Sequence, residues 1–199
     1  MGIISGSLTF FRLRFNENLK FDDEEIRNAL KTYEFDKLYE DEKFINYGFV
    51  PFTFPADSDF SISDIKFGSY FLFSIRIDEK KINKKYFDIE FEKMKRDYLK
   101  ENNKTALTKS DRDFIKNALN AKLLKKALPA SQIVEVLFSF EKKSIYLSAL
   151  NTKVMDTSEH LFRLAFDISI YKDSFLEILR VSGLSKLADN VLKLTPYDF

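Results

Sequence analysis

Apolar and polar residues alternate or recur along the chain in patterns that predict its strands and helices. Residues 6–15 alternate, with one break at Phe11, which is typical of a strand with one buried face. Asp22 and Glu25 form a capping pair, and apolar residues then recur at helical spacing as far as Tyr33. The chain is therefore predicted to begin with a strand followed by a helix.

The next part of the chain predicts two more strands separated by a loop. Residues 44–54 are aromatic and are interrupted by Gly48 and Pro51, which indicates a strand that ends in a turn. Residues 57–64 are rich in Ser and Asp, which favours a surface loop. Residues 70–77 are nearly all apolar, so we expect a strand in the centre of a sheet.

Residues 83–100 carry the clearest helical pattern in the chain. At about 100° per residue, four apolar side chains fall in one narrow stripe, and basic side chains gather on the opposite side. The stripe consists of Phe87, Phe91, Met94 and Tyr98. The short polar stretch 101–104 follows this helix and is the best candidate for an internal linker.

Residues 108–166 read as helix, β-hairpin and helix. The first helix begins at an S/T-x-x-D cap formed either by Thr108 with Asp111 or by Ser110 with Asp113, and we expect Pro129 to stop it. Runs Ile133–Phe140 and Ser144–Ala149 predict two paired strands joined at residues 141–143. Helical spacing returns over residues 152–166.

The order of these elements predicts an α+β fold with a largely antiparallel sheet and helices packed on one face. We expect residues 1–171 to form the main region. Residues 172–199 should add a short helical segment, with one helix over 174–181 closed by Gly183 and another after Ser185.

Composition narrows the class of protein. The chain has no cysteine, which excludes disulfides and fits a reducing cytoplasm. No apolar run has the length of about 18–20 residues that a transmembrane helix requires. We therefore expect a cytoplasmic protein with no membrane partner.

The charge is unevenly distributed, although the net charge is only +1. Residues 1–75 hold 8 Lys/Arg and 13 Asp/Glu (−5), residues 76–126 hold 16 and 9 (+7), and residues 127–199 hold 8 and 9 (−1). A basic middle third can present a cationic surface to an anionic partner. The alternative is a pair of well-solvated helices with no such role.

Most catalytic and cofactor motifs are absent from the sequence. There is a single histidine, His160, in a helical pattern that favours a surface or packing role, so we expect no metal site based on histidine or cysteine. The five glycines form no nucleotide-binding loop, and no serine-nucleophile elbow occurs. We expect no cofactor and no catalytic residues.

One catalytic pattern remains as an alternative. Asp57 or Asp64, followed by Glu79 and Lys81, loosely matches the D…(D/E)-x-K pattern of Mg²⁺-dependent nucleases, in which carboxylates hold the metal ion. The pattern is short enough to arise often by chance, and a charged turn after a buried strand is the favoured explanation. The 22 phenylalanines could stack on bases, but their strand and helix spacing favours core packing.

Read from end to end, the chain resembles the RdgC family of bacterial recombination-associated DNA-binding proteins over about residues 5–170. The shared features occur in the family's order and include the motifs Leu8–Arg12, Gly48–Pro51 with Ser58-Asp59, Leu107–Lys116 and Lys122–Pro129. The chain departs from the family at Ala130, where an arginine is usual, and it is shorter than family members.

This resemblance implies an RdgC-like fold and binding to double-stranded DNA without sequence specificity. It also implies a homodimer that surrounds DNA, restrains a RecA-type recombinase and so modulates homologous recombination or replication, with nucleoid association. Besides DNA binding and the Mg²⁺-dependent nuclease, a third possible function is a protein–protein interaction module without a nucleic-acid role.

The helix patterns suggest which residues contact DNA. Four cations lie on one side of the helix over 83–100, and four more lie on the helix that follows it. The predicted DNA-binding residues are Lys85, Lys93, Arg96, Lys100, Lys116, Lys122, Lys125 and Lys126. Their fields would add if folding brought the two sets onto one concave surface.

Overall fold

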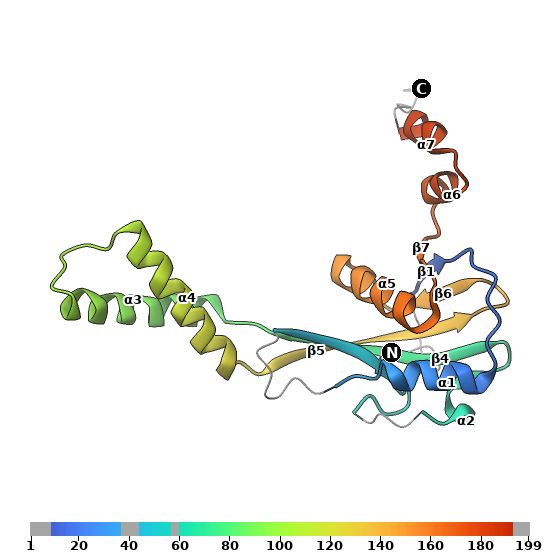
Figure 1. The fold of residues 1–199 in the computed structure, drawn as a ribbon, viewed down its shortest axis with the longest axis horizontal. Coiled ribbons are helices and arrows are strands. Elements are labelled where there is room, and N and C mark those ends of the chain that lie inside the picture. Colours follow the sequence, from blue (N-terminus) through green and yellow to red (C-terminus); the bar gives the residue numbers. More distant parts are fainter. Residues whose placement is uncertain (1–8, 37–43, 57–59, 193–199) are drawn as a thin grey trace. The chain divides into compact units, whose positions relative to one another are not determined.

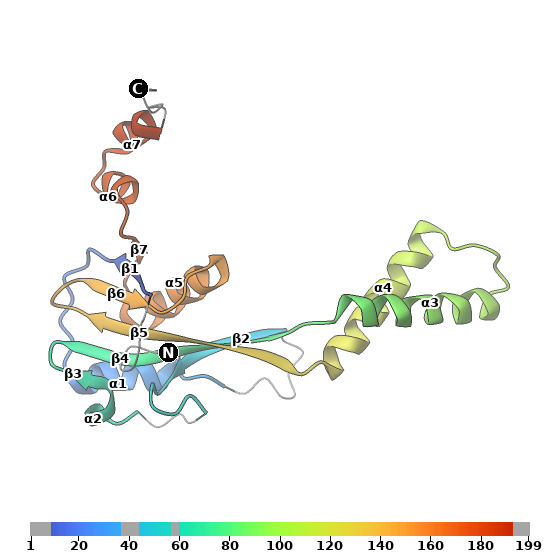
Figure 2. The ribbon, with the colours of Figure 1, turned by 180° about the vertical axis from the view of Figure 1, so that it is seen from behind.

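The structure is a computed structural model that describes residues 9–36, 44–56 and 60–192. Within these residues it has an α+β fold, with seven helices and a seven-stranded antiparallel sheet, as predicted (Figures 1 and 2). The elements in chain order are β1 (Phe11–Arg14), α1 (Asp23–Thr32), β2 (Ile45–Val50), α2 (Ile62–Ile65), β3 (Lys66–Phe67), β4 (Tyr70–Lys80), α3 (Lys84–Glu101), α4 (Lys109–Lys126), β5 (Pro129–Ser139), β6 (Ser144–Leu147), α5 (Thr152–Phe166), β7 (Tyr171–Lys172), α6 (Phe175–Val181) and α7 (Ser185–Leu192).

Two compact units make up the described chain. The first, which we call the sheet unit, contains residues 9–35, 48–56, 60–76 and 133–192. The second, the hairpin unit, contains residues 36, 44–47 and 77–132 and includes α3 and α4. The boundaries between the units fall inside β2, β4 and β5.

The strand order is β2-β4-β5-β6-β1-β7, with β3 paired to β4, so β4 is an inner strand as its apolar sequence predicts. β5 and β6 form the predicted antiparallel hairpin, with Val136 opposite Leu147 and Ser139 opposite Ser144. Lys143 closes the hairpin turn with a positive φ of 47°. β1 pairs with β6 and β7, and Asp173 after β7 forms ion pairs with arginines of β1.

The core of the sheet unit is largely aromatic and explains many of the phenylalanines. α1 and α5 contact each other and lie on one face of the sheet (Figures 1 and 2). The ring of Phe162 on α5 lies 6.0, 6.2 and 5.2 Å from the rings of Phe49, Phe73 and Phe138, which come from β2, β4 and β5. All four side chains are fully buried, so this cluster fixes α5 against the sheet.

Gly48 in β2 is required by a close approach of two backbone segments. A Cβ atom added to Gly48 would lie 2.5 Å from both the Cα and N atoms of Phe35. The Phe35 amide donates to the Phe49 carbonyl at 2.9 Å, and the Phe49 amide donates to the Tyr33 carbonyl at 2.9 Å. Only glycine lets the segment after α1 run this close to β2.

Most helix ends match their predicted caps. Asp22 and Glu25 form the predicted capping box at α1, and the predicted Gly183 follows α6 with a φ of +79°. At α4 the structure selects Thr108 with Asp111 between the two predicted caps. The α4 helix ends at Lys126, just before Pro129, which begins β5.

One local prediction was wrong, and one predicted strand is longer than expected. Residues 62–65 form the short helix α2 instead of a loop, because Ile65 is buried and anchors a helical turn there. The strand predicted over 70–77 continues to Lys80, and both Asp78 and Lys80 are buried. The predicted loop residues 57–59, which include Asp57, lie outside the described residues.

Candidate nucleic-acid interface

The hairpin unit contains a pair of contacting helices, α3 and α4, inserted in the chain between β4 and β5. Asn83 caps α3 by accepting a hydrogen bond from the Tyr86 amide at 3.3 Å. The predicted stripe Phe87, Phe91, Met94 and Tyr98 is half-buried, and the ring of Tyr98 lies 6.4 Å from that of Phe114 on α4. The apolar stripe of α3 therefore faces α4, and the opposite side of α3 faces solvent.

A polar clasp holds the start of α4 against the end of α3. The Asp111 carboxylate accepts hydrogen bonds from the Tyr98 hydroxyl at 2.7 Å, from the Lys104 ammonium at 2.9 Å and from the Thr108 amide at 3.1 Å. These donors, Lys104 first, hold the pKa of Asp111 well below its ordinary value of 3.8. The same hydrogen bonds with Asp111 raise the pKa of Lys104 and of Tyr98.

The solvent-facing side of α3 carries four of the predicted cations. Lys85, Lys93, Arg96 and Lys100 are all exposed and fall within an arc of about 80° around the helix axis. No acidic residue of α3 falls inside this arc. We call these four residues the α3 cationic face.

The acidic residue nearest to this face is already paired. Glu92 lies at the edge of the arc, and its carboxylate accepts a 3.0 Å hydrogen bond from Lys95. None of the four cations of the α3 cationic face forms an ion pair within the described chain. Their charge is therefore available to an external anion.

The four predicted cations of α4 are also exposed, but they do not join the α3 cationic face. Lys116, Lys122, Lys125 and Lys126 project from a helix that packs on the opposite side of α3. The structure thus brings the α3 set together and leaves the α4 set on other surfaces of the hairpin unit. Residues 77–132 still hold 15 Lys/Arg and 9 Asp/Glu, giving +6.

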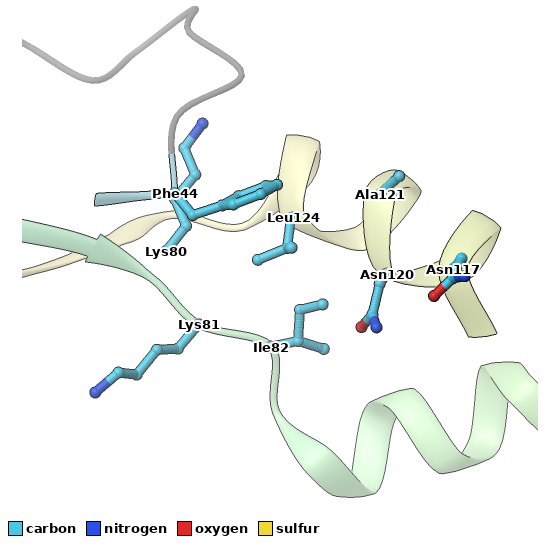
Figure 3. A pocket seen from close by; sticks show the side chains of 8 residues that line it. All are labelled: Phe44, Lys80, Lys81, Ile82, Asn117, Asn120, Ala121 and Leu124. Carbon is cyan, nitrogen blue, oxygen red and sulfur yellow. The ribbon is translucent and has the colours of Figure 1, made fainter. Parts of the chain in front are cut away.

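An open groove of about 640 Å³ lies beside α4 within the hairpin unit (Figure 3). Its apolar side chains are Phe44, Ile82, Ala121 and Leu124. Its polar side chains are Lys80, Lys81, Asn117 and Asn120. The Lys80 amide donates to the Phe44 carbonyl at 2.8 Å, which fixes Phe44 at the groove.

We call this groove the first hollow. A second hollow of about 300 Å³ adjoins it and shares Lys81 and Ile82 with it. It is also lined by Asn83, Tyr86, Leu123, Lys126 and Ala127. The sequence patterns did not single out this pair of hollows. Phe44 reads as a strand residue, and the asparagines of α4 look like solvated helix positions, so no local signal joins them.

The described residues do not favour the nuclease alternative. Asp57 lies outside them, and Asp64 is an exposed residue of α2 that accepts a hydrogen bond from Ser63 at 3.3 Å. Glu79 forms an ion pair with Lys81 at 3.0 Å. Within the part of the chain that the structure describes, no three or more Asp, Glu and His residues cluster as a metal site would require.

His160 is exposed on α5, where the adjacent Leu161 and Phe162 are buried in the core. In the described ranges, no helix combines the length and the apolar character needed to cross a membrane.

No protein-family model matches the sequence, and a comparison with curated proteins finds no relative. The resemblance to the RdgC family therefore stays a prediction.

Proposed function

We propose that the protein binds double-stranded DNA without sequence specificity, through the hairpin unit. The observation that carries this proposal is the α3 cationic face, where four exposed cations share one arc with no acidic residue between them. Cations in such an arrangement bind the phosphate backbone and release its counterions. Phosphate contacts carry no sequence information, so this surface binds all duplexes alike.

The proposal is tested by the salt dependence of duplex binding. Each phosphate neutralised steepens the slope of log K against log salt by about 0.9 for duplex DNA. Arg96→Ala combined with Lys100→Ala should therefore flatten the slope by up to about two units and weaken binding to every sequence equally. Fluorescence anisotropy of a labelled duplex, titrated at several salt concentrations, measures both quantities.

A control variant separates this surface from the effect of overall charge. Lys172→Ala combined with Lys186→Ala removes the same charge from exposed positions of the sheet unit. The control should leave the slope close to that of the parent. Equal slopes for the parent and the Arg96/Lys100 variant would show that the α3 cationic face does not contact DNA.

We further propose that the protein acts as a homodimer in the cytoplasm, associated with the nucleoid, and restrains a RecA-type recombinase. The resemblance to the RdgC family is the main support for this part. Phe114 on α4 and Leu128 after it add to it, because these apolar side chains are 64% and 84% exposed. Light scattering should report a dimer at micromolar concentration, and a monomer at every concentration would contradict it.

A protein–protein interaction module is the second candidate, and one feature of the sheet unit favours it. α6 and α7 contact each other and still expose several large apolar side chains. Phe175, Leu184 and Leu192 are 64%, 50% and 58% exposed. If the duplex titrations detect no binding at low salt, this second function replaces the first.

A further inference from the structure

The two adjoining hollows of the hairpin unit share a pattern of side chains. Each has one exposed aromatic side chain at its edge, Phe44 in the first and Tyr86 in the second, which are 51% and 52% exposed. Each also contains amide and ammonium groups. A repeated set of aromatic, amide and cationic groups indicates a ligand with repeated chemistry.

The aromatic side chains are not explained by packing. Phe49, Phe73, Phe138 and Phe162 are fully buried in the core of the sheet unit, whereas Phe44 and Tyr86 keep half of their surface in water. An exposed ring beside a groove offers a flat surface on which a nucleobase can stack. Leu124 and Ile82 also line the first hollow, so a base stacked on Phe44 would have further apolar contacts there.

The polar groups match the edges and the backbone of a nucleotide. Asn117 and Asn120 project from neighbouring turns of α4 toward the first hollow, and a side-chain amide both donates and accepts hydrogen bonds with a base edge (Figure 3). In the second hollow, the Asn83 oxygen accepts from the Tyr86 amide, which leaves its NH₂ group as a donor. Lys126 adds a positive charge there that suits a phosphate.

The shape of the site favours a strand over a small metabolite. The first hollow is open, so a free metabolite would leave much of its surface in water, unlike ligands in enclosed sites. A polymer can lay one unit in each hollow while its backbone passes over the shared Lys81 and Ile82. Lys81 forms an ion pair with Glu79 at 3.0 Å, so the residues shared by the two hollows carry little free charge.

We propose that these two hollows bind two neighbouring unpaired nucleotides of a single-stranded nucleic acid, with Phe44 and Tyr86 as the stacking residues. This goes beyond duplex binding by the α3 cationic face and does not depend on it. Bases inside a duplex are stacked on one another and cannot enter the hollows. The protein therefore has a second mode of binding, selective for melted or single-stranded segments.

The test compares a labelled oligo-dT strand with a labelled duplex in anisotropy titrations of the full chain. Phe44→Ala and Tyr86→Ala should each weaken binding to oligo-dT by about fivefold or more, the loss expected when one stacked base is released. The slope of log K against log salt should not change, because no phosphate contact is removed. Duplex affinity should remain that of the parent.

Matched variants make the result specific. Phe54→Ala removes an aromatic side chain that is 61% exposed on the sheet unit and lines neither hollow, so it should bind oligo-dT like the parent. Phe44→Tyr and Tyr86→Phe keep the rings and should retain affinity. Circular dichroism of each variant confirms that it is folded before its affinity is compared.

Photo-cross-linking gives a second, direct measurement. A strand containing 5-bromodeoxyuridine should cross-link to peptides containing Phe44 or Tyr86, identified by mass spectrometry. Unchanged oligo-dT affinity in folded Phe44→Ala and Tyr86→Ala variants would overturn the inference, as would cross-links confined to other peptides. Because duplex binding is measured with a different ligand and different variants, either proposal can fail while the other stands.

Discussion

Replacing Phe162 with alanine should remove the side chain on which the packing of α5 against the sheet depends. Phe162 is fully buried, and its ring lies within 6.2 Å of rings from three strands, those of Phe49, Phe73 and Phe138. Alanine would lose the apolar burial of the ring and leave a cavity that this close-packed cluster cannot easily fill. Changes of this kind lower the free energy of unfolding by about 3–5 kcal/mol.

The loss can be read from urea unfolding followed by far-ultraviolet circular dichroism. With an m value of about 2 kcal/mol per molar urea, the midpoint should fall by about 1.5–2.5 M. Domains are stable by about 5–15 kcal/mol, so the variant should still fold in the absence of urea. Phe162→Leu keeps most of the apolar volume but loses the ring contacts, so its midpoint should lie between those of alanine and the parent.

Leu164→Ala is the matched control because it truncates a side chain of the same helix that is 46% exposed. Its unfolding free energy should differ from that of the parent by less than about 0.5 kcal/mol. The reasoning is refuted if Phe162→Ala and Leu164→Ala shift the midpoint equally. Such a result would mean that α5 is not fixed by its aromatic contacts with β2, β4 and β5.

Two further variants test the backbone contact at Gly48 and the clasp at Asp111. Gly48→Ala should cost about 1–3 kcal/mol in urea unfolding, because its Cβ atom would meet the Phe35 backbone at 2.5 Å; a midpoint equal to that of the parent would contradict this close approach. Because the pKa of Asp111 is lowered on folding, its stabilising contribution is present at neutral pH and is lost as the pH falls below its unfolded value of about 4. Asp111→Asn should therefore have a lower urea midpoint than the parent at pH 7 and a smaller difference at pH 3. An equal difference at both pH values would exclude the clasp as its cause.

Much of the fold could be predicted from the sequence because its elements follow local rules. The β5–β6 hairpin, α3 and α5 are each specified by a periodic run with capping or turn residues at its ends. The extension of β4 to Lys80 was not predictable in this way. Asp78 and Lys80 look like solvated residues in the sequence, and only their tertiary surroundings bury them.

The choice of the α4 cap shows the same limit. Thr108 with Asp111 and Ser110 with Asp113 fit the capping pattern equally well in sequence. The structure selects Asp111, which also accepts hydrogen bonds from Tyr98 and Lys104. Tyr98 belongs to the preceding helix, so a contact outside the local pattern decides between two locally equivalent choices.

One part of the candidate site can be predicted from the sequence, and the rest depends on tertiary packing. The α3 cationic face follows from one helix and its 100° rotation per residue, so the sequence is sufficient to find it. The predicted common surface with the α4 cations depended on how two helices pack, and α4 packs on the opposite side of α3. The first hollow joins Phe44 to residues of α4 that are more than 70 positions away in the chain, which no local pattern reveals.

The position of α3 and α4 between β4 and β5 has a consequence for how this protein can vary. The helix pair leaves one strand of the sheet and returns on its immediate neighbour, so the sheet register does not depend on the length of the insertion. Whole turns could be gained or lost from both helices near residues 101–108 without disturbing the aromatic core. The length of the helix pair, to which we assign DNA binding as a proposal, could thus vary while the sheet and its core stay unchanged.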